Sequence, residues 1–161
     1  MMVSVFPVGS LPAATLQEIY GFAFNGTYAN PNGLVLGSDG AFYGTTASGG
    51  VGGYGSVFRV TANGALTDLV SFADTNGTSP QATLIQGPNG IFYGTTFFGG
   101  ANGYGTVFQV TTNGTLTTLA SFANTNGAYP VAPLVRATDG DLYGTTSGGA
   151  AVNPFMAPCF G

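Results

Sequence analysis

The sequence predicts an all-β protein, a β-propeller-type array of four-stranded antiparallel blades built from about three repeats of fifty residues. The first observation is the period, because the stretch Tyr-Gly-Thr-Thr begins at Tyr43, Tyr93 and Tyr143. The second is that residues 51–100 and 101–150 are identical at 27 of 50 positions without a gap. The third is that each period contains short strand-like runs and no helical spacing. A period of this length is typical of stacked or circular arrays.

Each period is expected to contain four strands, which we call a to d. Strand b is the Tyr-Gly-Thr-Thr stretch, and the other strands are expected at 34–37, 84–86 and 134–136 (a), 56–60 and 106–110 (c), and 66–72 and 116–122 (d). The connections from a to b and from c to d carry dipeptides that supply two left-handed residues to a type I′ turn. These dipeptides are Asp39-Gly40, Asn63-Gly64, Asn89-Gly90, Asn113-Gly114 and Asp139-Gly140. Each period is therefore expected to form an antiparallel meander.

The strands carry apolar residues on both faces, as in Val57-Phe58 followed by Val60. A sheet with two apolar faces must be sandwiched between other sheets, as blades are in a propeller. Strand b also contains an internal glycine, at Gly44, Gly94 and Gly144. Glycine weakens a strand unless a neighbouring group needs the room, so we expect these glycines to permit close approach of adjacent blades.

The blade boundaries are out of phase with the ends of the sequence. Residues 16–22 align with 66–72 at a shift of fifty, so the array is expected to open on a lone outer strand that completes a blade. The expected units are an N-terminal extension (1–15), the three-repeat array (16–149) with its lone strand (16–22), two blades (31–72 and 81–122) and a partial blade (131–149), and a C-terminal segment (150–161) with a degenerate strand. Three blades fall below the usual four to eight. A closed ring of copies, an open fibre and a fragment of a longer array all remain open.

The composition is nearly uncharged, with charged residues at 5% against a typical value of about 25%. The only cations are Arg59 and Arg136, which lie in different repeats and cannot form the basic stripe that nucleic acids require. No apolar run is long enough for a membrane helix. A surface rich in Thr, Asn, Ser and Gly is unlike that of most cytosolic proteins. It predicts an extracellular or cell-surface location and partners that are copies of the same chain.

The residues required by common catalytic systems are missing. The sequence has no His and no Lys, and Cys159 is its only cysteine. Nucleophilic triads, Schiff-base chemistry and His or Cys zinc sites are thereby excluded. Most of the six carboxylates fall at turns or exposed strand positions, which disfavours a glycosidase pair. We therefore expect a non-enzymatic protein without a cofactor or a metal.

The long loops, from b to c and from d to a, are expected on one rim of the array, where scaffold proteins usually carry function. Phe97 and Phe98 break the repeat there, since the equivalent residues are Ala47-Ser48 and Ser147-Gly148. The residues expected to bind a ligand or form an interface are Tyr54, Phe97, Phe98, Tyr104, Tyr129, Asp74 and Asn124. Aromatic rings with nearby Asp and Asn are typical of sugar sites, so a lectin-like propeller that binds glycans is the alternative to self-assembly. Asn25 and Asn76 match the glycosylation pattern on this rim.

The repeat also resembles a known family. The resemblance rests on Gly105-Thr106-Val107-Phe108, Leu116-Thr117-Thr118-Leu119, Ser121-Phe122, the Pro130–Leu134 region, Asp139-Gly140 and Tyr143-Gly144-Thr145-Thr146. This pattern looks like the bacterial GloVer tandem repeat and covers about residues 16–149. The resemblance implies a secreted or surface-anchored repeat protein, and it brings no catalytic residues with it.

Overall fold

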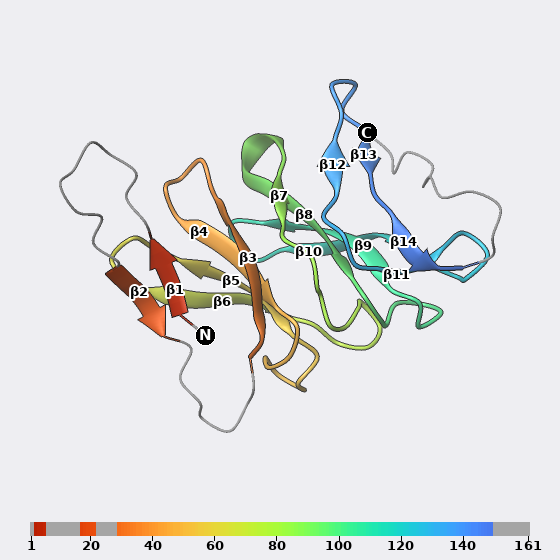
Figure 1. Ribbon diagram of the computed structural model, residues 1–161, viewed down its shortest axis with the longest axis horizontal. Coiled ribbons are helices and arrows are strands. Elements are labelled where there is room, and N and C mark those ends of the chain that lie inside the picture. The colour runs from red at the N-terminus through yellow and green to blue at the C-terminus, as the bar shows by residue number, and fades with distance from the viewer. Residues whose placement is uncertain (1, 6–16, 22–28, 150–161) are drawn as a thin grey trace.

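Two four-stranded antiparallel sheets form the centre of the protein (Figure 1). The computed structural model describes residues 2–5, 17–21 and 29–149. The first sheet has the order β3 (Pro31–Leu36), β4 (Phe42–Thr46), β5 (Ser56–Val60) and β6 (Leu66–Ser71). The second has the order β7 (Ile85–Gln86), β8 (Ile91–Thr96), β9 (Thr106–Thr111) and β10 (Leu116–Ser121), with the single 3-10 turn η1 (Pro88–Gly90) between β7 and β8. Each sheet is a meander in chain order, which confirms the predicted blades.

The third repeat forms only part of a blade among the described residues. Strands β12 (Val135–Arg136) and β13 (Leu142–Tyr143) pair with each other and correspond to strands a and b. Strand b is interrupted at residues 144–145, after which β14 (Thr146–Gly148) pairs with β11 (Ala128–Pro130). The degenerate strand expected within 150–161 lies outside the described residues.

The strand expected at 16–22 is present as β2 (Gln17–Gly21), but it is not alone. It pairs with β1 (Met2–Val5), which falls in the expected N-terminal extension. Within the described part of the chain, β2 therefore does not complete the third repeat by itself. Along the long axis in Figure 1, the β1–β2 hairpin lies at one end, the two sheets follow, and β11 and β14 lie toward the other end, with β12 and β13 above the second sheet in this view.

The two sheets pack face to face through aromatic rings. Tyr43 of the first sheet stacks on Phe92 of the second at a centroid distance of 4.1 Å, and Phe72 meets Phe108 edge to face at 5.1 Å. The other face of the second sheet packs against Leu134 and Leu142 of the third repeat. The second sheet is thus covered on both faces, as its two apolar faces predicted.

The predicted turn type is wrong at four of the five Asx-Gly dipeptides. Only Asn89-Gly90 has both residues in the left-handed region, with φ of 55° and 72°. At the other four, only the glycine has a positive φ. In the first of them, the Gly40 N–H donates to the Gly37 carbonyl at 2.9 Å and the Gly37 N–H donates to Ala41 at 2.8 Å. This is a three-residue connection that ends in a glycine bulge, the other common way to join twisted strands.

The internal glycines of strand b make room within their own sheet and not for a neighbouring blade. A Cβ atom on Gly44 would lie 2.6 Å from the Phe58 Cζ, and one on Gly94 would lie 2.6 Å from the Phe108 Cζ. Each phenylalanine is the cross-strand partner of its glycine in the register of the sheet. The strand c ring therefore lies over the glycine, which explains the Tyr-Gly-Thr-Thr motif in these two repeats.

Candidate functional site

Four of the seven residues expected at a site gather in one aromatic cluster, which we define as Phe97, Phe98, Tyr104 and Tyr129. Tyr129 lies at its centre and contacts the other three rings. Its centroid lies 5.2 Å from Phe97, 5.6 Å from Phe98 and 5.7 Å from Tyr104. Phe97 and Phe98 meet edge to face at 4.5 Å. The cluster thus joins the b–c loop of the second repeat to the d–a loop that enters the third.

The backbone that holds Tyr129 is in a conformation unusual for a large side chain. Tyr129 has φ of 58°, and its N–H donates to the Tyr104 carbonyl at 2.9 Å. The equivalent residue one repeat earlier, Ser79, has φ of 52° and donates to the Tyr54 carbonyl at the same distance. The loop architecture therefore imposes the left-handed position in both repeats. At Tyr129 a ring occupies a position that costs a residue with a side chain about 1–3 kcal/mol.

Only one ring of the cluster presents a large surface to solvent. Phe98 is 46% exposed, whereas Phe97, Tyr104 and Tyr129 are half-buried. Tyr54 is also exposed, but it stands apart, because the residues equivalent to the rest of the cluster are Ala47, Ser48 and Ser79. The structure therefore separates Tyr54 from the other predicted aromatic residues.

Asp74 and Asn124 occupy equivalent positions in separate loops, and both are exposed. The Asp74 carbonyl accepts from the Gly100 N–H at 2.8 Å, and the Asn124 N–H donates to Gly127 at 3.1 Å. Both of these hydrogen bonds are made by backbone atoms, so they fix the two loops and not the Asp74 and Asn124 side chains. Asn76 has a structural role, since its Oδ1 accepts from the Ala73 N–H at 2.8 Å. Asn25 lies outside the described residues.

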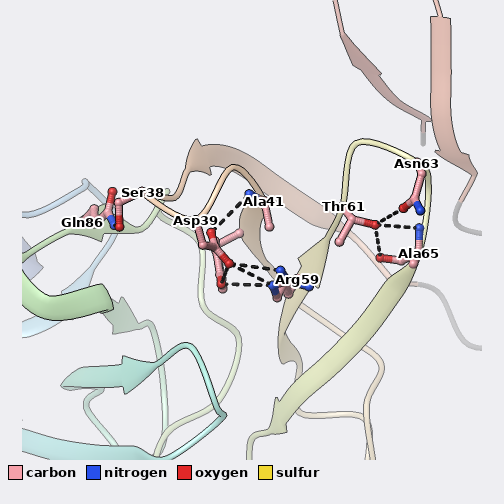
Figure 2. Close-up of polar contacts among 9 residues, drawn as sticks. Ser38, Asp39, Ala41, Arg59, Thr61, Asn63, Ala65 and Gln86 are labelled. Atoms are coloured by element: carbon pink, nitrogen blue, oxygen red, sulfur yellow. Dashed lines mark hydrogen bonds and ion pairs between the residues drawn. The ribbon is translucent and has the colours of Figure 1, made fainter.

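Besides the aromatic cluster, the structure contains a polar cluster on the rim of tight turns, which the sequence did not predict (Figure 2). The Arg59 Nη2 lies 3.0 Å from the Asp39 Oδ2, and the Tyr43 hydroxyl donates to the same oxygen at 2.9 Å. The Arg59 Nε also donates to the Tyr43 hydroxyl at 3.1 Å. Tyr43 and Arg59 are directly opposite each other on β4 and β5. The contact could have been predicted from the strand register, because side chains that are directly opposite on paired strands lie next to each other on one face.

The electrostatics of this polar cluster are those of a stabilised surface ion pair. Burial raises the pKa of the Asp39 carboxyl, but the hydrogen bonds from Tyr43 and Ala41 and the Arg59 guanidinium outweigh it, so the pKa lies below its ordinary value. Burial and the Asp39 carboxylate raise the pKa of Tyr43. Arg59 and Asp39 are both partly exposed, so solvent screens their ion pair, and the cluster fixes the turn between β3 and β4.

Within residues 2–5, 17–21 and 29–149, no three His, Cys, Asp or Glu side chains come together as a metal site. No helix in the described ranges has the length and apolar character needed to cross a membrane.

Two solved glycosidase structures are similar to this chain at low sequence identity. One is the GH43_1 enzyme from Xanthomonas citri complexed with xylotriose, with a TM-score of 0.45, 19% identity, and coverage of 93% of this chain and 45% of the enzyme. The other is CoXyl43, a GH43 β-xylosidase/α-arabinofuranosidase from a compost microbial metagenome, with a TM-score of 0.40, 15% identity, and coverage of 76% and 44%. The chain spans less than half the length of either enzyme.

No curated protein sequence matches this chain. The family expected from the repeat motifs is nevertheless confirmed by a family model. The model of the Gloeobacter/Verrucomicrobia repeat matches residues 7–154, and the chain therefore belongs to this repeat family.

Proposed function

We propose that the protein is a non-enzymatic structural repeat protein of the cell exterior, in which copies assemble by completing each other's blades. The observation that carries the proposal is the outer face of the third repeat. Tyr143 is 38% exposed there and Val135 is 65% exposed. The equivalent Tyr43 is 0% exposed, and Val35 is partly buried against the core between the sheets.

An open blade face is costly in an array of this kind. Each repeat buries its apolar surface only against its neighbours, so a repeat face without a neighbour needs polar residues or a partner. The third repeat keeps apolar residues at two positions that are buried or partly buried in the first. Its strand β13 also has only β12 as a hydrogen-bonded neighbour among the described strands. An unpaired edge next to an exposed apolar face favours association with another chain.

The location and the lack of catalysis belong to the same proposal. Charged residues make up 5% of the chain, and the net charge is only -4, so much of the surface depends on amides and hydroxyls for hydration. A surface that is covered by further copies of the chain does not need charged residues to stay soluble. The absence of His and Lys from the sequence supports a structural role over an enzymatic one.

The test is the native mass, measured by light scattering over a range of protein concentrations. We expect particles larger than the 16.1 kDa chain, and Val135→Asp should weaken them at least tenfold. Tenfold corresponds to about 1.4 kcal/mol, which is less than the full burial of a valine contributes. A wild-type protein that stays at the mass of one folded chain refutes the proposal.

Val35→Asp is the matched control, because it makes the same change at the equivalent position of the first repeat. Val35 is partly buried within one chain, so the variant should lower the stability of the chain itself. Val135→Asp should leave the unfolding midpoint of the isolated chain within about 0.5 kcal/mol of wild type, as expected for a surface position. Equal effects of the two variants on the mass of the particle would contradict the assignment of this face.

A second candidate function is supported by the aromatic cluster. An exposed ring of Phe98 beside the Tyr104 and Tyr129 rings provides the apolar surface on which a sugar face can stack. No equivalent cluster exists around Tyr54, so binding at this rim would be confined to the second and third repeats.

The test is a glycan array with the folded protein, followed by calorimetry on any ligand found. Phe98→Ala should abolish binding and change stability by less than about 1 kcal/mol, because the ring is half exposed. Tyr54→Ala is the control and should leave binding unchanged. An array without a ligand, or loss of binding in both variants, refutes the sugar site.

A further inference from the structure

The two hairpins at the ends of the described chain have the backbone registers of the two halves of one blade. In β1–β2, Val3 pairs with Tyr20 and Ser4 pairs with Glu18, so one residue of β2 is skipped. In β5–β6, Val57 pairs with Val70 and Phe58 pairs with Asp68, with the same residue skipped. The β9–β10 hairpin repeats this irregularity between Thr118 and Ala120. Because Tyr20 and Glu18 lie fifty residues before Val70 and Asp68, the bulge is at the equivalent position in all three hairpins.

A shared bulge assigns the β1–β2 hairpin to a place in the blade. Bulges fix the local twist and the pairing register of a hairpin, and they are specific features of a strand pair. The β1–β2 hairpin therefore corresponds to strands c and d. This goes beyond the sequence repeat, since Met2–Val5 shares only one residue, a valine, with the equivalent stretch 56–59.

The β12–β13 hairpin corresponds to strands a and b by the same criterion. Val135 pairs with Tyr143 and Arg136 pairs with Leu142. In the second sheet, the equivalent pairs are Ile85 with Tyr93 and Gln86 with Phe92. The described chain thus contains two complete blades, one c–d hairpin and one a–b hairpin.

We propose that the β1–β2 hairpin of a second copy adds to the edge of β13 that has no partner among the described strands, so that two half-blades from two chains form one complete blade. This inference rests on the self-assembly proposed above and specifies its junction. The b–c register of the complete blades, Tyr43 with Arg59 and Thr45 with Val57, gives the pairs at the junction. Tyr143 of β13 is then opposite Val5, and Thr145, which lies in the interrupted stretch after β13, comes opposite Val3 when the incoming strand extends the pairing.

The position of the hairpin on its own chain fits this role without rearrangement. Figure 1 places β1 and β2 beside the first sheet, on the side away from the second sheet. Phe58 and Val60 of the first sheet are 0% exposed, although neither of the other two repeats covers their face. The hairpin therefore occupies the place of the outer half of a preceding blade. The inner half of that blade, strands a and b, is the part that a second copy would supply.

A second copy is favoured over closure within one chain. Figure 1 shows the β1–β2 hairpin at one end of the long axis, beside the first sheet, and the β12–β13 hairpin above the second sheet, so that the first sheet lies between the two hairpins along this axis. The repeats described here, taken from two chains joined at both junctions, make six blades, within the usual range of about four to eight. Exchange of a two-stranded hairpin replaces the exchange of a lone strand expected from the sequence.

The test is disulfide cross-linking between single-cysteine variants in a Cys159→Ser background. Val3→Cys protein is mixed with Thr145→Cys protein under mild oxidation, and a covalent heterodimer is expected on a non-reducing gel. The control replaces Val3→Cys with Ser4→Cys, which is one residue out of register. A one-residue shift turns the cysteine to the opposite face, so this pair should give at least tenfold less heterodimer.

Each outcome separates the junction from self-assembly. Light scattering of the Cys159→Ser protein reports whether particles form, and circular dichroism reports whether each variant is folded. If particles form but the matched pair gives no more heterodimer than the shifted pair, the proposed junction is wrong and self-assembly still stands. A single folded chain in solution overturns both. If Val3→Cys fails to fold, the pair Val5→Cys and Tyr143→Cys tests the same register.

Discussion

Thr95 offers the sharpest test of the packing between repeats. Its hydroxyl is buried at 2% residue exposure, and its Oγ1 has no hydrogen-bond partner in the part of the chain that the structure describes. The equivalent Thr45 accepts from the Asn32 Nδ2 at 2.9 Å and donates to the Ala82 carbonyl at 3.5 Å. Fifty residues after Asn32 stands Ala82, which has no side-chain amide. The second repeat therefore lacks the donor that satisfies the hydroxyl in the first.

We expect Thr95→Val to stabilise the protein. A buried polar group without a partner costs about 1–3 kcal/mol, and valine has nearly the shape of threonine without the hydroxyl. A gain of about 1–2 kcal/mol corresponds to a rise of roughly 2–8 °C in the melting temperature for a chain of this size. Thr45→Val should act in the opposite direction by about 1–2 kcal/mol, because it removes one of the two acceptors of the Asn32 amide and leaves only the Pro80 carbonyl.

Urea unfolding followed by circular dichroism measures both variants. The slope against urea should stay unchanged, so that a shift of the midpoint reports stability alone. All proteins are compared at one concentration and one particle mass, because assembly raises the apparent stability. A Thr95→Val protein that is less stable than wild type refutes the reasoning, as does a stabilised Thr45→Val protein.

Two further predictions concern the first and second sheets. Gly94→Ala should destabilise the protein by about 1–3 kcal/mol, because its Cβ would lie 2.6 Å from the Phe108 Cζ and 2.7 Å from the Leu84 Cδ2. Gly103→Asn, at a left-handed position with no atom within 4 Å, should cost less than about 1 kcal/mol in the same urea assay, and equal costs would contradict the clash. The lowered pKa of Asp39 should make its ion pair with Arg59 stabilising above an ordinary carboxyl pKa of about 4, and this contribution should disappear as the pH falls through the lowered value. Arg59→Gln should therefore cost about 0.2–1 kcal/mol at pH 7, and this cost should shrink as the pH falls through the lowered pKa of Asp39, whereas a pH-independent difference would show that the charge of Asp39 is not involved.

The strands were predictable because their signals are local. The fifty-residue period and the Asx-Gly dipeptides mark the tight turns from a to b and from c to d in the two complete blades. The turn type was not predictable from the dipeptide alone, since Asp39-Gly40 and Asn89-Gly90 look alike but differ in the φ of the first residue. Pro88 precedes Asn89, whereas Ser38 precedes Asp39, and the backbone of each turn also depends on the flanking strand register.

The aromatic cluster was partly predictable, because loops that leave the same ends of a meander meet on one rim. Phe97, Phe98 and Tyr104 belong to one such loop, and Tyr129 belongs to its neighbour. The separation of Tyr54 from the aromatic cluster could not be predicted without knowing which loops of neighbouring repeats contact each other. The Asp39 and Arg59 contact required the cross-strand register, which a list of charged residues does not contain.

The third repeat gives the clearest physical reason to look beyond one chain. Residues of the same kind, Tyr43 and Tyr143, are 0% and 38% exposed because only the first has a neighbouring blade on that face. Burying a tyrosine and a valine contributes about 1.5–3 kcal/mol each, so covering this face would favour association by several kcal/mol before entropy is counted. Asp141 marks the margin of such an interface, because it stands where Ala41 is buried. A partner that leaves the Asp141 turn in solvent and covers Val135 and Tyr143 would match both the apolar and the charged residues of this face.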